Sequence, residues 1–274
     1  MKKLLGAIAA LAMTVGLAAC GTPANQGTTN PNQLVVGMEA GYPPFNWTQN
    51  DDSNGGVKIQ GTNQYAGGYD VEIAKLVAQK LGKELVIVKT EWDGLTPALI
   101  SGKIDAIIAG MSPTEERKAT IDFTDSYYDS QLVLVVKKGS KYEKATSLAD
   151  FAGAKVTAQL NTFHYSVIDQ IPGVEKVTAM DNFPAMRVAL QAGTIDAYVS
   201  ELPEALSAQA ANSDFVMVKL TDGFKASPED TQTAVGVRKD STLTKEINEA
   251  LKTISSEERL QIMQDAIKNQ PAAE

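Results

Sequence analysis

The sequence predicts an α/β fold of two lobes, because one supersecondary unit occurs in it twice. Residues 97–106 read PALISGKIDA and residues 184–197 read PAMRVALQAGTIDA, with the interval from proline to Ile-Asp-Ala four residues longer in the second copy. Four residues make about one helical turn. Each copy therefore predicts an amphipathic helix, a glycine stop and a buried strand, as expected of two lobes built on one plan.

The first lobe begins with a strand, a helix and a second strand. Residues 34–38 (LVVGM) predict the first strand and lead to a glycine-, proline- and aromatic-rich loop at residues 40–47. The polar residues 48–66 predict an exposed hairpin or loop. A helix opens at Asp70 with apolar residues at helical spacing, a glycine stops it, and residues 85–88 (LVIV) form the next strand.

Residues 92–117 bring a guanidinium to a helix start. The apolar run at 104–110 (IDAIIAG) predicts a buried strand, and Thr114 is the candidate hydroxyl cap of the helix that follows. Arg117 lies in the first turn, where a cation opposes the helix dipole by roughly 0.3–1 kcal/mol. Either a bound anion or the two neighbouring glutamates must compensate it. We favour the anion, because backbone N–H groups, a hydroxyl and an arginine converge at the end of a strand.

The second lobe lies between two crossings of the chain. Residues 132–136 (LVLVV) predict the buried strand that enters it, and the chain returns near residues 226–237. Residues 243–269 are strongly helical in pattern and are assigned to the first lobe. Two crossings make a hinge that suits closure on a ligand. The predicted parts are residues 1–20 as a lipoprotein signal peptide, 21–33 as a flexible tether, 34–129 with 226–274 as lobe 1, and 130–225 as lobe 2.

The two copies of the repeat end in opposite charges. The first strand opens onto Arg117, and the second, which contains Asp196, opens onto Ser200 and Glu201. If the two rims face each other across a cleft, the complementary ligand is a small zwitterion, with its carboxylate on Arg117 and its ammonium on Glu201. That ligand is an α-amino acid.

Composition excludes several classes of partner. The chain has 25 Lys and Arg against 33 Asp and Glu, and its net charge of −8 becomes −10 without Lys2 and Lys3. Such an acidic chain is not expected to bind nucleic acid or, through a basic patch, anionic lipid heads. A content of 43% hydrophobic and 21% charged residues is that of a globular protein with a packed core.

The amino terminus has the features of a lipoprotein signal. Lys2 and Lys3 precede an apolar run, and Leu-Ala-Ala-Cys ends it at Cys20, the single cysteine of the chain. An ordinary signal peptide is the alternative, and the position of the only cysteine favours lipidation with acyl chains such as palmitate. The run is too short for a spanning helix of ~20 residues. Residues 21–33 lack charge and large apolar side chains and predict the tether.

These motifs together resemble a known family. The order Tyr42-Pro43-Pro44-Phe45, Gly68 to Glu72, Ser112 to Arg117, Gln159 to Thr162 and Ile195 to Glu201 is similar to that of the substrate-binding lipoproteins of polar amino-acid ABC importers, solute-binding protein family 3. The resemblance runs from about residue 34 to about residue 239. It implies a two-lobed periplasmic-binding-protein-like (type II) fold, each lobe a mixed sheet flanked by helices, with the ligand cleft between lobes. It further implies an extracytoplasmic, lipid-anchored monomer without cofactor or metal, which passes an amino acid to a permease and its ATPase.

The resemblance also implies which residues hold the amino-acid backbone. Arg117 would bind the carboxylate in bidentate fashion, helped by the hydroxyl and amide of Ser112 and by Thr162 from the facing lobe. Gly110 would accept the ammonium on its carbonyl oxygen while Glu201 pairs with it. The family more often has aspartate at the position of Glu201, and a small residue, often glycine, just before Thr162.

The side chain of the ligand is less closely specified. Tyr42 and Tyr69 match aromatic positions that sandwich it, a contact worth roughly 0.5–2 kcal/mol for a cation. Glu39 matches an acidic position at its far end. This set slightly favours arginine, lysine or histidine, and glutamine or another uncharged polar amino acid is the alternative.

An enzyme on the same fold is the less favoured reading. The chain has one histidine, His164, and none of the common nucleophile, zinc-protease or nucleotide-binding motifs. A carboxylate-dependent lyase using Glu39 and Glu201 is the form that such an activity would take. His164 is a poor metal candidate without a second ligand nearby, and it is expected to cap or flank the helix that starts there.

Overall fold

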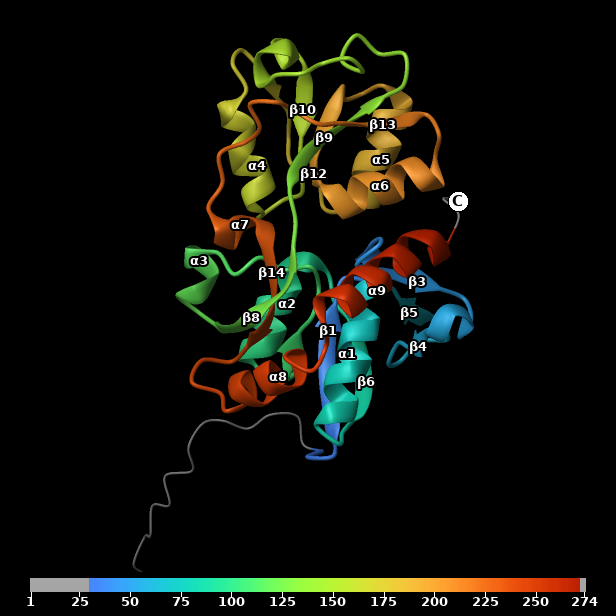
Figure 1. Cartoon of the computed structure of the whole chain (residues 1–274), viewed down its shortest axis with the longest axis vertical. Helices are drawn as coiled ribbons and strands as arrows, with labels where there is room; N and C mark the ends of the chain where they lie inside the picture. The colour runs from blue at the N-terminus through green and yellow to red at the C-terminus, as the bar shows by residue number, and fades with distance from the viewer. Residues whose placement is uncertain (1–29, 272–274) are drawn as a thin grey trace, which may run out of the picture.

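The computed structural model describes residues 30–271 and contains two five-stranded sheets, one in each lobe (Figure 1). The first has the order β6-β1-β7-β14-β8 and the second the order β11-β10-β12-β9-β13. The strands of the first are β6 (Glu84–Lys89), β1 (Gln33–Met38), β7 (Ala106–Ile107), β14 (Gln232–Val237) and β8 (Asp122–Asp129). Those of the second are β11 (Glu175–Lys176), β10 (Lys155–Thr157), β12 (Ala197–Glu201), β9 (Leu132–Lys137) and β13 (Phe215–Val218).

Both sheets are mixed in the same way. In the first, β1 pairs in parallel with β6 and β7, and β14 is antiparallel to β7 and β8. In the second, β10 pairs in parallel with β11 and β12, and β9 is antiparallel to β12 and β13. The predicted plan of two similar α/β lobes is therefore confirmed, and the fold class is the two-lobed mixed α/β arrangement that the sequence predicted.

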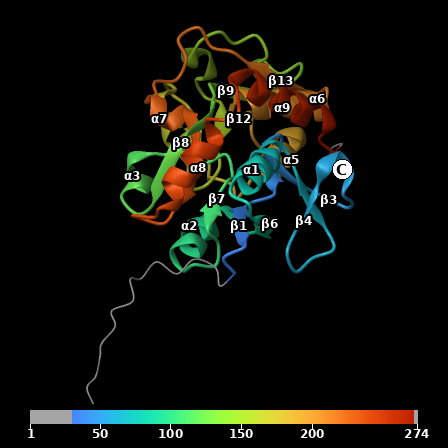
Figure 2. The same cartoon turned by 60° about the horizontal axis from the view of Figure 1, so that its bottom comes forward.

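Helices flank the sheets, and α9 lies between α1 and α6 in both views (Figures 1 and 2). The α-helices are α1 (Tyr69–Lys80), α2 (Trp92–Ile100), α3 (Glu115–Lys118), α4 (Phe163–Val167), α5 (Phe183–Ala192), α6 (Leu202–Ala211), α7 (Pro228–Thr231), α8 (Leu243–Leu251) and α9 (Ser256–Asn269). Short 3-10 helices occur at η1 (Ser53–Gly55), η2 (Leu148–Phe151) and η3 (Ile168–Gln170).

The aspartate of the repeated Ile-Asp-Ala makes an equivalent hydrogen bond in each lobe. Asp105 follows α2 and accepts a hydrogen bond on Oδ2 from the backbone N–H of Val35 at 3.1 Å. Asp196 follows α5 and accepts one on Oδ2 from the N–H of Lys155 at 2.8 Å. Asp105, just before β7, is thus linked to β1, and Asp196, just before β12, is linked to β10. These bonds are strong because an ionised carboxylate is a good acceptor of N–H bonds.

The chain crosses between the sheets twice. After β8 in the first sheet it enters β9 in the second, and after β13 in the second it returns to β14 in the first. The boundaries 34–129, 130–225 and 226–274 stay a prediction. The signal segment, with Cys20, and most of the tether lie outside the described residues.

Three local predictions need adjustment. The run at 104–110 is buried as expected, yet only Ala106–Ile107 pairs as β7. The helical pattern at 243–269 forms two helices, because the chain turns before Ser255, whose hydroxyl accepts from the N–H of Glu258 at 3.1 Å and caps α9. The polar segment 48–66 contributes to a small sheet whose strands are β2 (Gly41–Tyr42), β3 (Asn46–Gln49), β5 (Tyr65–Gly67) and β4 (Val57–Lys58).

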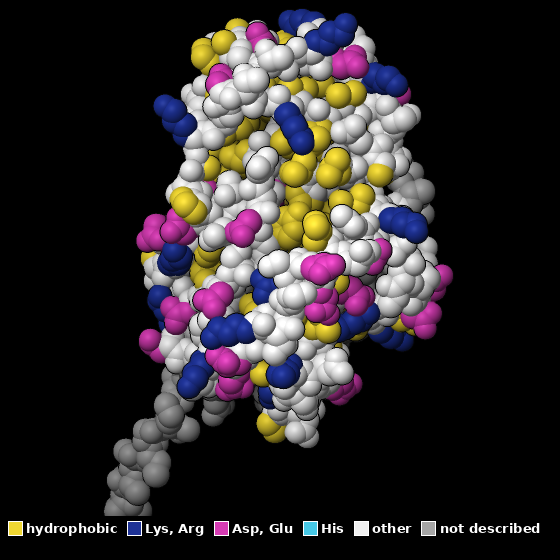
Figure 3. All heavy atoms as spheres, in the orientation of Figure 1, with side chains coloured by type: hydrophobic (Ala, Val, Ile, Leu, Met, Phe, Trp, Pro, Cys, Tyr) yellow, Lys and Arg dark blue, Asp and Glu magenta, His cyan; other side chains and the backbone are white. Residues whose placement is uncertain are grey.

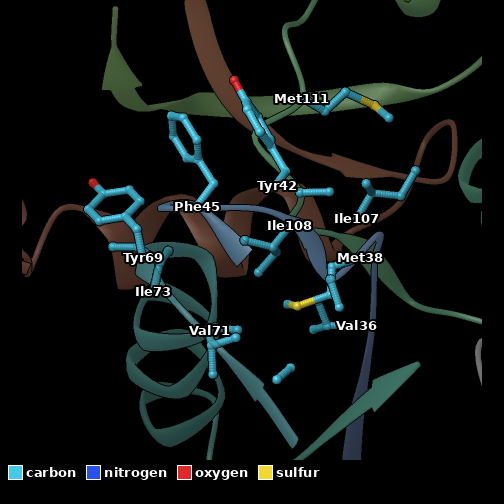
Figure 4. Packing of buried hydrophobic residues seen from close by; sticks show 14 of the residues in the cluster. Val36, Met38, Tyr42, Phe45, Tyr69, Val71, Ile73, Ile107, Ile108 and Met111 are labelled. Atoms are coloured by element: carbon cyan, nitrogen blue, oxygen red, sulfur yellow. The ribbon is translucent and has the colours of Figure 1, made fainter. Parts of the chain in front are cut away.

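Buried apolar side chains join the two lobes. The larger cluster includes Val36, Tyr42 and Ile107 from the first lobe together with Phe183 and Tyr198 from the second. Figure 4 shows the first-lobe part, in which the side chains of the central strands pack beneath the aromatic rings. The lobes therefore meet along an apolar interface. No helix among residues 30–271 is long and apolar enough to span a membrane.

Surface charge on the visible face is mixed. Acidic and basic side chains intermix over the lower lobe, and apolar side chains gather over the upper lobe (Figure 3). A continuous basic stripe, which a nucleic-acid surface requires, is not present on this face.

Candidate ligand site between the lobes

A small cavity of about 10 Å³ lies where the two lobes meet. Five of the eight predicted binding residues line it: Tyr42, Gly110, Ser112, Arg117 and Thr162. The other lining residues are Trp92, Gln159, Phe163, His164 and Phe183. Both lobes thus deliver side chains to one place, from α3 and the segment before it in the first lobe and from α4 and the start of α5 in the second.

Arg117 occupies the predicted corner. Thr114 caps α3, and its Oγ1 accepts from the N–H of Arg117 at 3.4 Å, so the expected helix start is confirmed. The guanidinium donates through Nη1 to the carbonyl of Ser112 at 2.9 Å and through Nη2 to the carbonyl of Asn161 at 3.2 Å. Its Cζ lies 5.0 Å from the centre of the Trp92 ring. A guanidinium has five N–H donors, so donors remain for a carboxylate.

The charge of Arg117 survives its burial. Burial lowers the pKa of Arg117 to about 10, which is still well above neutral pH. Its neighbour Ser112 is buried, and the hydroxyl of Ser112 donates to the carbonyl of Asp230 at 3.0 Å. Thr162 precedes α4 and donates through Oγ1 to the carbonyl of Gln159 at 2.7 Å. The cation is therefore fixed among carbonyl oxygens, with a hydroxyl on each side of the cavity.

Any side chain at position 110 would be strained. The φ of Gly110 is +62°, and a Cβ at this position would lie 2.7 Å from Cε1 of Tyr42. Its N–H donates to Oη of Tyr127 at 3.1 Å, and that hydroxyl donates to Oδ1 of Asp70 at 2.7 Å. Burial raises the pKa of Asp70 to about 7, against the lowering effect of the hydrogen bonds from Tyr127 and Asn46. The buried hydrogen bonds from Gly110 to Tyr127 and from Tyr127 to Asp70 thus fix the peptide of Gly110.

Tyr42 and Tyr69 lie differently with respect to the cavity. The ring of Tyr42 stacks on Phe183 of the second lobe at 4.5 Å and on Phe45 at 4.9 Å. Tyr69 lies one ring further away, edge-on to Phe45 at 6.1 Å, and its hydroxyl donates to the carbonyl of Tyr127 at 2.8 Å. Figure 4 shows the two hydroxyl groups pointing in different directions. Tyr69 does not line the cavity.

Glu201 does not line the cavity itself but is in contact with His164, which does. Glu201 is the last residue of β12, is only 1% exposed, and its Oε1 lies 3.1 Å from Nε2 of His164. Its charge is a further cause, after burial, of the raised pKa of the Tyr42 hydroxyl, so the negative field of Glu201 extends to the cavity wall.

Glu39 does not line the cavity but is hydrogen-bonded to the wall residue Gln159. Its Oε2 accepts a hydrogen bond from Nε2 of Gln159 at 3.1 Å, across the lobe interface. Burial raises the pKa of Glu39 from 4.5 to about 7, an effect that the bond from Gln159 opposes and that nearby Glu91 strengthens. The carboxyl group therefore changes charge near neutral pH.

A larger groove of about 540 Å³ also lies between the lobes, and Glu39 is part of its wall. Its charged lining includes Lys89, Glu91 and Arg187, the last of which is paired with Glu204 at 2.7 Å. Arg117 and Ser112 line the small cavity and not this groove. We therefore assign the candidate site to the small cavity, with the groove beyond Glu39.

Five residues that line the cavity were not predicted from the sequence as binding residues: Trp92, Gln159, Phe163, His164 and Phe183. His164 was expected only to cap or flank a helix, and Phe183 and the side chain of Gln159 were not considered as wall residues. The ring of Trp92 lies against Arg117, a tertiary contact that the sequence does not indicate. The available signal for Phe183 was its place at the start of the second repeated helix. Among residues 30–271, no group of three or more His, Cys, Asp and Glu side chains is arranged to hold a metal ion.

The family follows from comparison with known proteins. The model of the bacterial extracellular solute-binding proteins, family 3, matches residues 34–267. The chain belongs to this family. The description of the family as extracellular supports an extracytoplasmic location, as the sequence predicted.

Individual relatives cover nearly the whole chain. The arginine-binding extracellular protein ArtP of Bacillus subtilis is 30% identical over 95% of this chain and 96% of its own length. The ABC transporter glutamine-binding protein GlnH of the same species is 30% identical over 99% of this chain and 100% of its own. The amino acid ABC transporter substrate-binding protein AbpA of Streptococcus pneumoniae, solved with L-arginine, has a TM-score of 0.74 at 27% identity and covers 86% of this chain and 95% of that one. All three relatives are named as binding an amino acid or solved with one bound, and two of them are named as parts of ABC transporters.

Proposed function

We propose that the protein captures a polar L-amino acid outside the cell membrane, closes its two lobes on it and delivers it to an ABC import permease. One observation carries this proposal above the others. Arg117 of the first lobe lines the cavity, and on the second lobe the wall residue His164 is hydrogen-bonded to the buried Glu201, so the two lobes bring a cation and an anion to the same region. A molecule with both charges on one carbon is complementary to that arrangement.

In this proposal the carboxylate of the ligand lies on Arg117. The amide of Ser112 adds a hydrogen bond, and the hydroxyls of Ser112 and Thr162 turn from their carbonyl partners to the carboxylate. The guanidinium, held by two carbonyl groups, needs little reorganisation. The carbonyl of Gly110 and the carboxylate of Glu201 take the ammonium. The side chain of Glu201 is one methylene longer than that of the usual aspartate. This extra length suits a residue that is separated from the cavity by His164 and must still contact the ligand.

Glu39, Tyr42 and Tyr69 are proposed to meet the ligand side chain. Tyr42 is at the cavity wall, whereas Tyr69 needs the lobes to part or its ring to turn before it makes contact. Glu39 at the far end favours arginine, lysine or histidine, in keeping with the named ligands of ArtP and AbpA. Because a carboxylate also accepts from an amide, glutamine is the second candidate, in keeping with the name of GlnH.

We further propose that a diacylglyceryl group on Cys20 anchors the protein, with residues 21–33 as a tether on the order of 20 Å in reach. In this arrangement a monomer would diffuse within a short distance of the permease and its ATPase. The support is the sequence of the signal segment and the extracellular family.

A thermal-shift panel against the twenty amino acids tests the proposal. The protein used is residues 21–271, which include the tether. A ligand at 100 times its Kd should stabilise the protein by ~2.7 kcal/mol. Arg117→Ala should lose the response to every ligand, whereas Lys118→Ala, which removes an exposed cation one residue away, should keep it. The bound amino acid should be recovered chemically unchanged, which separates binding from a lyase activity. A panel without any shift rejects the proposal.

A further inference from the structure

His164 is placed to act on the ligand site and not on its own helix. It is the second residue of α4, is 6% exposed and lines the cavity with Tyr42 and Arg117. Its Nε2 lies 3.1 Å from Oε1 of Glu201, while its Nδ1 has no hydrogen-bond partner among the described residues. Because an ionised carboxylate can only accept, Nε2 carries the proton that joins the two groups.

The second oxygen of Glu201 is left without a partner. Oε2 is buried and accepts no hydrogen bond from any residue between 30 and 271. The Oη of Tyr42, whose ring lines the same cavity, is buried and unpaired as well. A buried carboxylate oxygen without a donor is unfavourable, because it has lost its bonds to water and gained none from the protein. An ammonium group, with three donors and a positive charge, removes that penalty.

We propose that His164 is a positioning residue that prepares Glu201 for the ammonium of the ligand: it occupies Oε1 and leaves Oε2 for the ligand. This inference rests on the proposed function. A flexible glutamate would otherwise have to be ordered when the ligand binds, at a cost in side-chain entropy. The histidine removes that cost beforehand, and it explains how a glutamate can serve where the family more often has an aspartate.

The charges around the pair agree with this role. Arg117 lines the same cavity, so a carboxylate opposite it lies in a favourable field, and Tyr42 is neutral with a raised pKa. Burial is the main cause of the raised pKa of Asp70 and of Tyr128 in the first lobe, and the charge of Glu201 adds to it in both cases. The ammonium of a bound amino acid would lie beside Glu201, where the negative charge of this residue attracts it.

Ligands without the α-amino group separate positioning from packing. L-arginine is paired with guanidinovalerate and L-glutamine with glutaramate, each pair differing only in that amino group. Dissociation constants for all four are measured by calorimetry on the wild type, His164→Ala and His164→Gln. Glutamine at this position can place an amide N–H near the site of Nε2, so it should restore the bond to Glu201.

For the amino acid that binds, His164→Ala should raise Kd about tenfold or more, because the bond it removes is to a charged group. The deaminated partner should change less than twofold, and His164→Gln should return the amino acid to near wild-type affinity. Equal weakening of both members of a pair, no change, or tighter binding by His164→Ala would overturn the inference.

The proposed function has its own point of failure in this experiment. If wild type binds neither arginine nor glutamine, and the panel finds no other amino acid, the amino-acid proposal is rejected as a whole. If the wild type binds an amino acid and prefers it over the deaminated analogue, while both His164 variants keep that preference, only the role of His164 is rejected.

Discussion

Replacement of Glu39 by glutamine should change how stability depends on pH. Burial raises the pKa of Glu39 from 4.5 to about 7, and at 1.36 kcal/mol per pH unit this difference amounts to roughly 3 kcal/mol. The side chain is 4% exposed, so solvent screening is slight. Glu39→Gln keeps an oxygen that can accept from Nε2 of Gln159 and removes the titration.

The direction follows from proton binding. The folded protein holds the Glu39 proton up to about pH 7, whereas the unfolded chain releases it near pH 4.5. Between these values the folded state binds more protons, so the unfolding free energy of wild type falls as pH rises. Below the window the group contributes no difference. Glu39→Gln should therefore gain up to roughly 3 kcal/mol on wild type between about pH 4 and about pH 8.

Urea denaturation of ligand-free wild type and Glu39→Gln across this pH range measures the effect. Other titrating groups, such as Asp70, are common to both proteins and cancel in the difference. Glu175→Gln removes an exposed carboxylate of β11 in the second lobe and is the matched control. A wild-type-to-variant difference that stays constant across the range would refute the reasoning, because it would mean that the burial of Glu39 has no electrostatic consequence.

Two further changes are expected to act on stability. Gly110→Ala forces a Cβ to within 2.7 Å of the Tyr42 ring at a φ of +62°, so it should lower the unfolding free energy by about 1–3 kcal/mol, measured by urea denaturation; a change below about 0.5 kcal/mol would show that the ring gives way. Arg187→Ala leaves the fully buried Glu204 without its cation and should lower stability by about 3–5 kcal/mol in the same assay, with the ranking of ligands unchanged because the small cavity does not include Arg187; a changed ranking would place the groove within the ligand site.

The plan of the fold was predictable because its signals are local. Periodicity and a glycine stop identify α5 and β12, and the repeat of Ile-Asp-Ala identifies the equivalent places in the two lobes. The extent of strand pairing is harder to predict from the sequence. The run at 104–110 is as apolar as a long strand, yet only β7 pairs, since the number of paired residues depends on what β1 and β14 present beside it. The turn before α9 was hidden because apolar spacing continues on both sides of it.

The candidate site was predictable where backbone signals define it and not where tertiary contacts do. Thr114 and Arg117 carry the signature of a helix start, and the structure has that start. His164 is different. Nothing in the sequence near position 164 indicates that its ring meets Glu201, since the two residues are joined only by the packing of α4 against β12. A lone histidine in sequence thus has no recognisable partner until the fold supplies one.

The contacts that join the lobes use the groups that the ligand is proposed to use. Arg117 donates to Asn161 and Glu39 accepts from Gln159, each across the interface. The Tyr42 ring stacks on Phe183 in the same way. A cavity of about 10 Å³ has room for about one water molecule, so an amino acid must part these contacts to enter. Under the proposed function the ligand then exchanges them for its own bonds to the same groups. The closed state with ligand would keep most of the interactions of the closed state without it. It would add a bond that the lobes alone do not make, from the ammonium to Oε2 of Glu201.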